Sequence, residues 1–191
     1  MPDLIVLAGP NGAGKSTLAP LLLRDRLELA DYVNADTIAQ GLSAFQPEQV
    51  AFEAGRIMLK RLDELASARV TFAFETTLAA RSYAPWIRGL CNQGYRFHLA
   101  FVWLDSAELA VQRVKERVIR GGHHIPEEVV RRRYERGIRN FHVVYQPLAT
   151  SWAVYDNSAR GELALIATGR AGEPTTLQRA NLWYTFCRIT L

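Results

Sequence analysis

Cysteine is rare in this sequence of 191 residues, and long apolar runs are missing from it. Cys91 and Cys187 are too few for a disulfide framework and lack the spacing of metal ligands, so we expect reduced thiols in the core. No apolar run approaches the length of a membrane span. The apolar run near the N-terminus is not preceded by basic residues and is soon interrupted by Gly, Pro and Asn, so it does not resemble a signal peptide. We therefore expect a cytoplasmic protein that does not use a membrane.

Lysine is also scarce, so arginine supplies nearly all of the positive charge. Lys and Arg together number 23 against 19 Asp and Glu, which gives a formal net charge of +4. Arginine keeps its charge at any physiological pH and binds phosphate oxygens in a bidentate way. Two kinds of partner fit this surplus, a phosphorylated small molecule and nucleic acid, and we favour the first.

Short apolar runs alternate with helical patterns along the chain, and the length favours a single domain over residues 1–191. Strands are expected at 4–8, 31–33, 70–74, 97–104 and 152–155, with a weaker sixth at 162–167. Helices are expected at about 14–24, from Pro47, at 81–92, from Ser106 to Gly121-Gly122, from Pro126, and in the tail from Pro174. The alternation predicts a doubly wound, three-layer α/β/α fold with a mainly parallel sheet that is covered by helices on both faces. Ligands of such sheets bind at the carboxyl ends of the strands.

The first expected strand leads directly into a phosphate-binding motif. Residues 9–16 read GPNGAGKS and match the Walker A pattern G-x-x-x-x-G-K-[ST], with a helix following. The glycines let backbone N–H groups turn toward a phosphate, and the helix N-terminus adds partial positive charge. Lys15 would reach the β- and γ-phosphates of ATP, and the Ser16 hydroxyl would ligate Mg²⁺. The predicted nucleotide-binding residues of this loop are Gly9, Asn11, Gly12, Ala13, Gly14, Lys15, Ser16 and Thr17.

Acidic residues follow the second and third expected strands. Asp36, in the segment VNAD, could accept a proton from an attacking hydroxyl or hold a water on Mg²⁺. A helix N-cap explains Asp36 equally well. Glu75 follows the run VTFAF with no intervening turn, so we favour a place beside Mg²⁺ and the acceptor over a strand-end cap.

Two rows of arginine flank the Gly121-Gly122 pair. Helical spacing places each row on one face of its helix. Two such helices, over about 113–140, resemble a lid that closes on ATP and neutralises the transferring phosphoryl group. The alternative is a solvated basic face paired with neighbouring glutamates, and we expect only two or three of these arginines to be catalytic. The rows are Arg113, Arg117 and Arg120, then Arg132, Arg136 and Arg139.

Four further polar residues carry weaker signals. His123 and His124 lack a matching set of metal ligands, so protein-bound zinc is not favoured. Asp105 ends the fourth expected strand as a Walker B carboxylate would, but capping with Ser106 explains it equally well. Asn157 follows the fifth strand, where P-loop kinases often build part of the adenine pocket, and a plain turn is the alternative.

Together these motifs resemble the zeta-toxin-like P-loop kinases, over about residues 4–158. The resemblance is carried, in order, by AGPNGAGKST, VNAD, FAFETTL, ELAVQRVKERV, GGHHIPEEVVRRRYERG and YDNS. It implies a kinase fold with five parallel strands and a small antitoxin protein as a partner. The chain begins at the first strand, so no fused antitoxin is expected.

The resemblance also implies roles for single residues. Zeta toxins phosphorylate a sugar hydroxyl of UDP-N-acetylglucosamine. Their proposed base matches Asp36, their strand-three acid matches Glu75, and their lid arginines match Arg117 or Arg120 and Arg132. The expected activity is transfer of the γ-phosphate of ATP·Mg²⁺ to a hydroxyl of a small molecule such as a nucleotide sugar. A non-kinase ATPase or nucleotide switch, a pure toxin–antitoxin interaction module, and a nucleic-acid or nucleotide kinase are the alternatives.

Overall fold

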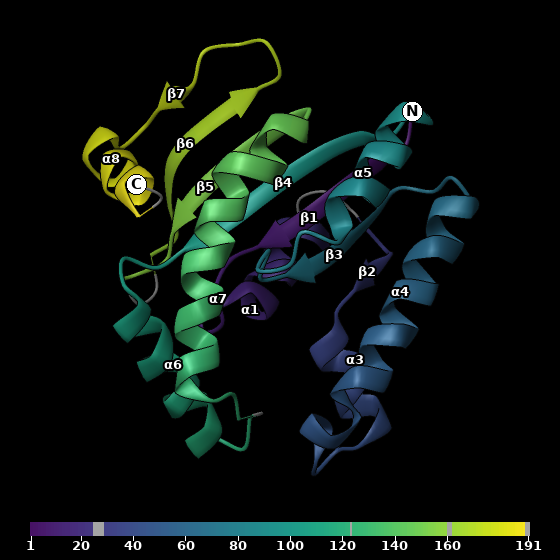
Figure 1. Ribbon diagram of the computed structural model, residues 1–191, viewed down its shortest axis with the longest axis vertical. Helices are drawn as coiled ribbons and strands as arrows, with labels where there is room; N and C mark the ends of the chain where they lie inside the picture. Colours follow the sequence, from purple (N-terminus) through teal and green to yellow (C-terminus); the bar gives the residue numbers. More distant parts are fainter. Residues whose placement is uncertain (25–28, 123, 160–161, 190–191) are drawn as a thin grey trace.

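The computed structural model describes residues 1–24, 29–122, 124–159 and 162–189 (Figure 1). Its strands are β1 (Asp3–Ala8), β2 (Tyr32–Val33), β3 (Phe72–Thr76), β4 (Arg96–Trp103), β5 (Ser151–Asp156), β6 (Ala164–Arg170) and β7 (Thr176–Leu177). Its α-helices are α1 (Lys15–Ala19), α3 (Ala35–Leu42), α4 (Ala51–Ser67), α5 (Tyr83–Asn92), α6 (Ala107–Ile119), α7 (Glu127–Asn140) and α8 (Ala180–Arg188). Shorter helical turns are η1 (Pro20–Arg24), η2 (Pro47–Val50), η3 (Phe141–Tyr145) and η4 (Gln146–Leu148).

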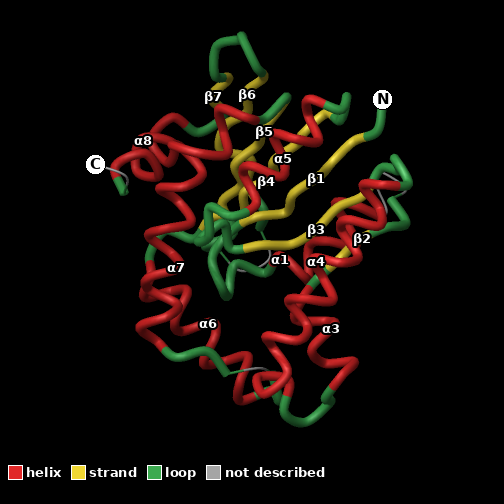
Figure 2. Tube along the Cα trace, turned by 45° about the vertical axis from the view of Figure 1, so that its right-hand side comes forward, coloured by secondary structure: helices red, strands yellow, loops and turns green. Residues whose placement is uncertain are grey.

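The strands form one sheet in the order β2-β3-β1-β4-β5-β6-β7, with helices on both faces (Figures 1 and 2). The first five in this order are parallel, whereas β6 pairs antiparallel with β5 and β7 antiparallel with β6. The expected three-layer α/β/α fold and its five parallel strands are confirmed. The strand count is corrected to seven, because the segment after β5 folds back along it instead of crossing over.

The central strands are apolar because both of their faces are covered. In β1 the residues from Leu4 to Ala8 are buried, and β4 beside it contributes Phe97, Phe101 and Trp103 with no exposed surface. Continuous apolar runs of this kind are typical of parallel strands inside an α/β fold. The core is therefore built around β1, which pairs with β3 on one side and β4 on the other.

The C-terminal tail docks on this core. Phe186 of α8 is fully buried and lies 5.5 Å from Phe101 and 5.7 Å from Trp103, measured between ring centroids. Trp183 stacks on Trp152 of β5 at 5.3 Å with an interplanar angle of 14°. Edge-to-face and stacked aromatic pairs of this kind add about 0.5–1.5 kcal/mol each beyond the burial of their area. The helix expected from Pro174 starts later, because β7 precedes it.

Two helical arms rise from the carboxyl edge of the sheet. One is α3 with the start of α4, and its first helix was not expected from the sequence. The other is the α6–α7 pair, in which Lys115 contacts Glu127 at 2.9 Å and Arg131 contacts both Glu108 and Glu127. The two arms face each other across the end of β1 (Figure 2). Among the helices described, none is long and apolar enough to cross a membrane.

Candidate active site

The Walker A segment forms a tight loop between β1 and α1. Gly9 has φ 142°, and a Cβ atom there would lie 2.1 Å from the Val102 carbonyl oxygen of β4. Gly14 caps α1 with φ 81° in the left-handed region. Both positions therefore require glycine. The side chain of Asn157, the residue after β5, donates to the Ala13 carbonyl oxygen at 2.8 Å. This bond connects the end of β5 to the loop.

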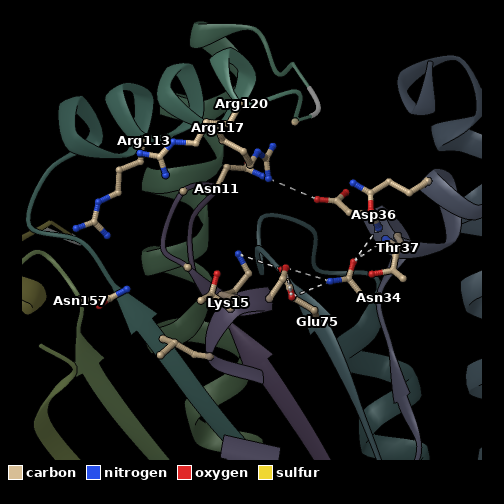
Figure 3. A pocket seen from close by; sticks show the side chains of 18 of the residues that line it. Asn11, Lys15, Asn34, Asp36, Thr37, Glu75, Arg113, Arg117, Arg120 and Asn157 are labelled. Atoms are coloured by element: carbon tan, nitrogen blue, oxygen red, sulfur yellow. Dashed lines mark hydrogen bonds and ion pairs between the residues drawn. The ribbon is translucent and has the colours of Figure 1, made fainter. Parts of the chain in front are cut away.

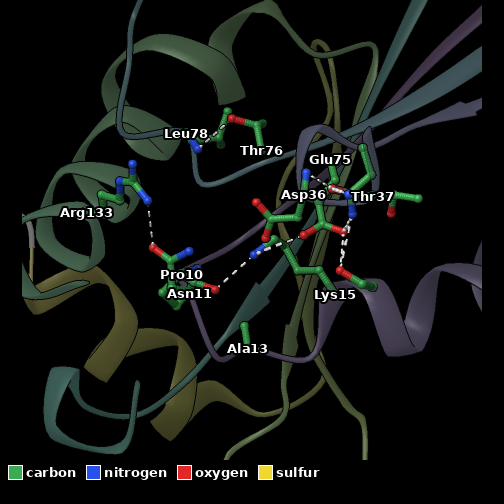
Figure 4. A network of polar contacts seen from close by, with 12 residues as sticks. Pro10, Asn11, Ala13, Lys15, Asp36, Thr37, Glu75, Thr76, Leu78 and Arg133 are labelled. Atoms are coloured by element: carbon green, nitrogen blue, oxygen red, sulfur yellow. Dashed lines mark hydrogen bonds and ion pairs between the residues drawn. The ribbon is translucent and has the colours of Figure 1, made fainter. Parts of the chain in front are cut away.

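Lys15 is buried inside the loop that it belongs to. Its ammonium group donates to the Pro10 carbonyl oxygen at 2.9 Å and lies 3.6 Å from Oε1 of Glu75 (Figure 4). Burial lowers the pKa of Lys15, while the carboxylates of Glu75 and Asp36 act in the opposite direction. The ammonium group is therefore held between the Pro10 carbonyl oxygen and the Glu75 carboxylate.

Glu75 is the centre of the polar network at the carboxyl edge. Its Oε2 atom accepts hydrogen bonds from the Ser16 hydroxyl at 2.9 Å, the Tyr32 hydroxyl at 2.6 Å and the Asn34 amide at 2.9 Å. Burial raises the pKa of Tyr32, and the charge of Glu75 raises it further. Tyr32 therefore remains a protonated donor. Three neighbouring strands, β2, β3 and β1 with its loop, thus converge on one carboxylate.

Asn34 is the N-cap of α3. Its side-chain oxygen accepts from the backbone N–H groups of Asp36 at 2.8 Å and Thr37 at 3.4 Å. The capping role considered for Asp36 thus belongs to Asn34. The Asp36 carboxylate instead points from the first turn of α3 toward the other helical arm, where its Oδ2 atom lies 3.9 Å from Nη1 of Arg117 (Figure 3).

A cavity of about 1380 Å³ lies between the two arms above this network. The structure brings most of the sequence-predicted site residues to it: Asn11, Gly12, Gly14, Lys15, Ser16, Thr17, Asp36, Glu75, Arg117, Arg120 and Asn157. Gly9, Ala13 and Arg132 are not among its lining residues. Gly9 and Ala13 are buried and shape the loop, with Ala13 accepting the bond from Asn157.

The arginines of the α6–α7 arm point in different directions, according to their positions around each helix. Arg113 and Arg117 of α6 and its C-cap residue Arg120 line the cavity, with Arg117 pointing toward Asp36 and Arg113 donating to the Ser158 carbonyl oxygen at 2.8 Å (Figure 3). In α7 the exposed Arg132 points elsewhere, since consecutive helical residues differ by about 100° in direction. Its neighbour Arg133 faces the loop instead.

Arg133 is a residue beside the P-loop that the sequence did not single out, as are Tyr32 and Asn34 beside Glu75, and it contacts the loop without lining the cavity. It is partly buried, and its guanidinium donates to Oδ1 of Asn11 at 3.4 Å (Figure 4). Burial lowers its pKa, and the charge of Asp36 acts in the opposite direction. A signal existed in the sequence, because Arg133 lies beside the apolar row of Val130, Tyr134 and Ile138 that turns α7 toward the core.

A divalent cation would find oxygen ligands at Ser16 and Glu75. Ser16 Oγ and Glu75 Oε2 lie 2.9 Å apart, both residues line the cavity, and oxygen atoms are the ligands that Mg²⁺ prefers. Within the described ranges no group of three or more His, Cys, Asp and Glu could hold a metal by itself. Asp105 accepts from the Ser106 hydroxyl at 3.0 Å and does not line the cavity. His124 is exposed, and His123 lies outside the described residues.

The family model of the zeta toxins matches residues 1–165 of the chain. The chain belongs to the zeta toxin family. The resemblance to this family is thereby confirmed, and the match covers more of the chain than the motifs do. An uncharacterized protein of Haemophilus influenzae is 29% identical to this zeta-toxin-family chain over 130 residues, which are 68% of this chain and 91% of that protein.

Solved structures share the fold of this zeta-toxin-family chain at low sequence identity. The AvrRxo1-ORF1:AvrRxo1-ORF2 complex with sulphate ions matches with a TM-score of 0.79 and 18% identity, over 100% of this chain and 64% of that chain. A structure of the PezAT chromosomal toxin–antitoxin system of Streptococcus pneumoniae matches with a TM-score of 0.68 and 17% identity, over 98% and 79%. The chain thus spans less than two thirds of the AvrRxo1-ORF1:AvrRxo1-ORF2 chain that it matches.

Replacing Tyr32 with Phe tests the network around Glu75. The change removes the 2.6 Å hydrogen bond to a partly buried carboxylate, and bonds to charged groups contribute about 1.5–3 kcal/mol. We expect the free energy of unfolding in urea to fall by about that amount. The matched variant Tyr184→Phe alters an exposed tyrosine and should stay within about 0.5 kcal/mol. Equal small losses in both variants would show that Tyr32 does not hold Glu75.

Proposed function

We propose that this chain is an ATP-dependent kinase that transfers the γ-phosphate of ATP to a hydroxyl of a small molecule, such as a nucleotide sugar. The observation that carries the proposal is that Lys15 and Ser16 of the P-loop, the Glu75 carboxylate and the Asp36 carboxylate line one cavity. Cavities for single drug-sized ligands measure about 300–1,000 Å³. The volume of about 1380 Å³ leaves room for a nucleotide and an acceptor together.

The nucleotide would occupy the P-loop side of the cavity. The phosphates would take the inward N–H groups of residues 12–17 and the ammonium group of Lys15, as in other P-loop enzymes. Asn157 lines the wall on the side of β5 and β6, where Tyr155, Leu163 and Leu165 form an apolar surface for the base. A structure of the AvrRxo1-ORF1:-ORF2 complex with ATP, similar in fold at a TM-score of 0.78, supports ATP as the nucleotide.

The acceptor would lie on the side of α3. Asp36 projects there from the first turn of the helix, with Arg117 across the cavity. In this position Asp36 would orient the acceptor hydroxyl and take its proton as the oxygen attacks the γ-phosphorus in line. Arg117, Arg120 and Arg133 would offset the negative charge that develops on the transferring group. The α6–α7 arm would then act as the lid.

Ser16 and Glu75 would hold Mg²⁺, Glu75 directly or through water, and Asp36 would contact it only through water. The metal would supply charge neutralisation at the β- and γ-phosphate oxygens. When ATP enters, the carboxylate of Glu75 would remain fixed by Tyr32 and Asn34, because both bonds come from β2 and the residue after it.

A small antitoxin protein is the proposed macromolecular partner. The PezAT system, similar in fold, is a toxin–antitoxin system of Streptococcus pneumoniae. The arginine surplus and the formal net charge of +4 would favour an acidic partner of this kind. We place the activity in the cytoplasm, where ATP and nucleotide sugars are available.

The function is tested by single-turnover transfer from γ-labelled ATP with Mg²⁺ to a panel of nucleotide sugars, sugars, nucleosides and oligonucleotides. Wild type should label one small acceptor. Asp36→Asn should lower the rate by about 10²–10⁴, the range for general bases, and Lys15→Ala should abolish transfer with the fold intact. Label released only as free phosphate, whatever acceptor is present, would replace the kinase with an ATPase or nucleotide switch.

The neighbouring arginines of α7 provide a matched pair of variants. Arg133 faces Asn11 of the P-loop and Arg132 faces solvent, so Arg133→Ala should slow transfer by about 10³ or more, as arginines on a transferring phosphoryl group do. Arg132→Ala should stay within about threefold of wild type, since surface changes are usually near neutral. A larger loss in Arg132→Ala than in Arg133→Ala would contradict the placement of the lid.

A further inference from the structure

A second hollow lies at the end of the sheet opposite to the P-loop, where β1 and β4 begin. It has a volume of about 550 Å³ and is lined by residues of β1, β4, β5 and β6, with Ile5 and Ala100 in its apolar floor. These strands lie side by side in this region (Figure 1). Asp3 begins β1 and Ala8 ends it, so the hollow lies roughly 17 Å from the P-loop at 3.3 Å per strand residue. None of the chemistry proposed above uses this hollow.

A row of side chains crosses four strands in this hollow. His98 of β4 is in register with Ser151 of β5 in a parallel pair, and Ser151 is in register with Arg170 of β6 in an antiparallel pair. Residues in register point to the same face of a sheet, with Cβ atoms about 5 Å apart in antiparallel pairs. Asp3 joins the row diagonally, because it lies two residues before Ile5, the partner of His98.

Asp3, His98 and Ser151 form a continuous hydrogen-bond chain. The Nε2 atom of His98 lies 3.1 Å from Oδ1 of Asp3, and its Nδ1 atom lies 2.8 Å from the Ser151 hydroxyl oxygen. These distances meet the geometric requirement for a nucleophile, its base and the group that orients the base. All three residues line the hollow, and the two ring nitrogens of His98 are both engaged.

The ionised state of Asp3 fixes the direction of this chain. Arg96 donates to both carboxylate oxygens, at 2.7 and 2.9 Å. Burial raises the pKa of Asp3, but the hydrogen bonds from Arg96 and His98 outweigh it and hold the pKa below its ordinary value. An ionised carboxylate can only accept, so the proton of a neutral His98 lies on Nε2. Its Nδ1 atom then carries no proton and accepts the hydrogen bond from the Ser151 hydroxyl.

Arg170 completes the constellation with a positive charge. It is in register with Ser151 across the antiparallel pair and lines the same hollow, so we assign its guanidinium to the oxyanion that forms beside the serine oxygen. Fixed positive charge at a developing oxyanion is a common source of transition-state stabilisation. The apolar floor suits a short acyl chain.

We propose that Ser151 is the nucleophile of a second active site, one that cleaves short-chain carboxylic esters. The serine oxygen bonds to the ester carbonyl carbon while its proton passes to Nδ1 of His98, and the carbonyl electron pair becomes an oxyanion beside Arg170. The C–O bond to the alcohol then breaks, and the alcohol leaves with the proton from His98. Water, deprotonated in the same way, releases the carboxylic acid and restores Ser151. Asp3 acts as a positioning residue for His98.

A fluorophosphonate with a short alkyl chain tests the nucleophile directly. Attack by the serine oxygen forms a P–O bond and expels fluoride, and intact mass with peptide mapping locates the adduct. We expect one adduct per chain, at Ser151, and none in Ser151→Ala. Ser67→Ala, which changes an exposed serine at the end of α4, should label as wild type does. No adduct, or an adduct at another serine, would overturn the proposal.

The roles of the other residues are tested by hydrolysis of p-nitrophenyl butyrate. His98→Asn should lower kcat by about 10²–10⁴, the contribution of a general base. Arg170→Ala, at an exposed position that tolerates change, should lower kcat by at least tenfold. Asp3→Asn should lower kcat and leave KM unchanged. A merely structural role for Asp3 would not separate the two constants in this way. Melting temperatures check folding, and hydrolysis that persists in Ser151→Ala or Arg170→Ala at the wild-type rate would refute the site.

Discussion

The buried charge of Lys15 is the constraint on which the rest of the active-site edge depends. A lysine residue with only 5% of its surface exposed carries a charge that is costly to bury without a counter-charge, and Glu75 supplies that counter-charge from the neighbouring strand. The pairing is possible because β1 and β3 are adjacent and parallel, with Leu7 in register with Glu75. Strand order therefore decides which carboxylate meets the Lys15 ammonium group.

The same carboxylate organises the residues that surround it. Tyr32 and Asn34 reach Glu75 from the short strand β2 and the residue after it, so a strand of only two residues is fixed at the sheet edge by its side chains. Asn34 also caps α3, and that cap determines where Asp36 points. The proposed base is thereby coupled to the proposed metal ligand through one amide side chain, without a direct contact between the two carboxylates.

Sequence reasoning succeeds here where a local pattern carries the information. The P-loop, the parallel strands and the Ser106 cap of α6 follow from composition and spacing within a few residues. It fails where the answer depends on packing. Helix α3 is short and contains Gly41, and β7 has two residues and forms only by pairing with β6. The exposure of Arg132 and the contact of Arg133 with Asn11 both depend on how α7 is rotated against the core. The Asp3–His98–Ser151 chain likewise exists only through strand register, because its members are separated by more than fifty residues.

A crystal structure with a non-hydrolysable ATP analogue and Mg²⁺ tests the central claim most directly. Phosphate offers Lys15 a better counter-charge than the Pro10 carbonyl oxygen does. The account predicts that the ammonium group leaves Pro10 for the β- and γ-phosphate oxygens, while Tyr32 and Asn34 keep Glu75 in place and Asp36 faces the γ-phosphate. An analogue bound with Lys15 still on Pro10, or with Asp36 turned away from the γ-phosphate, would contradict it.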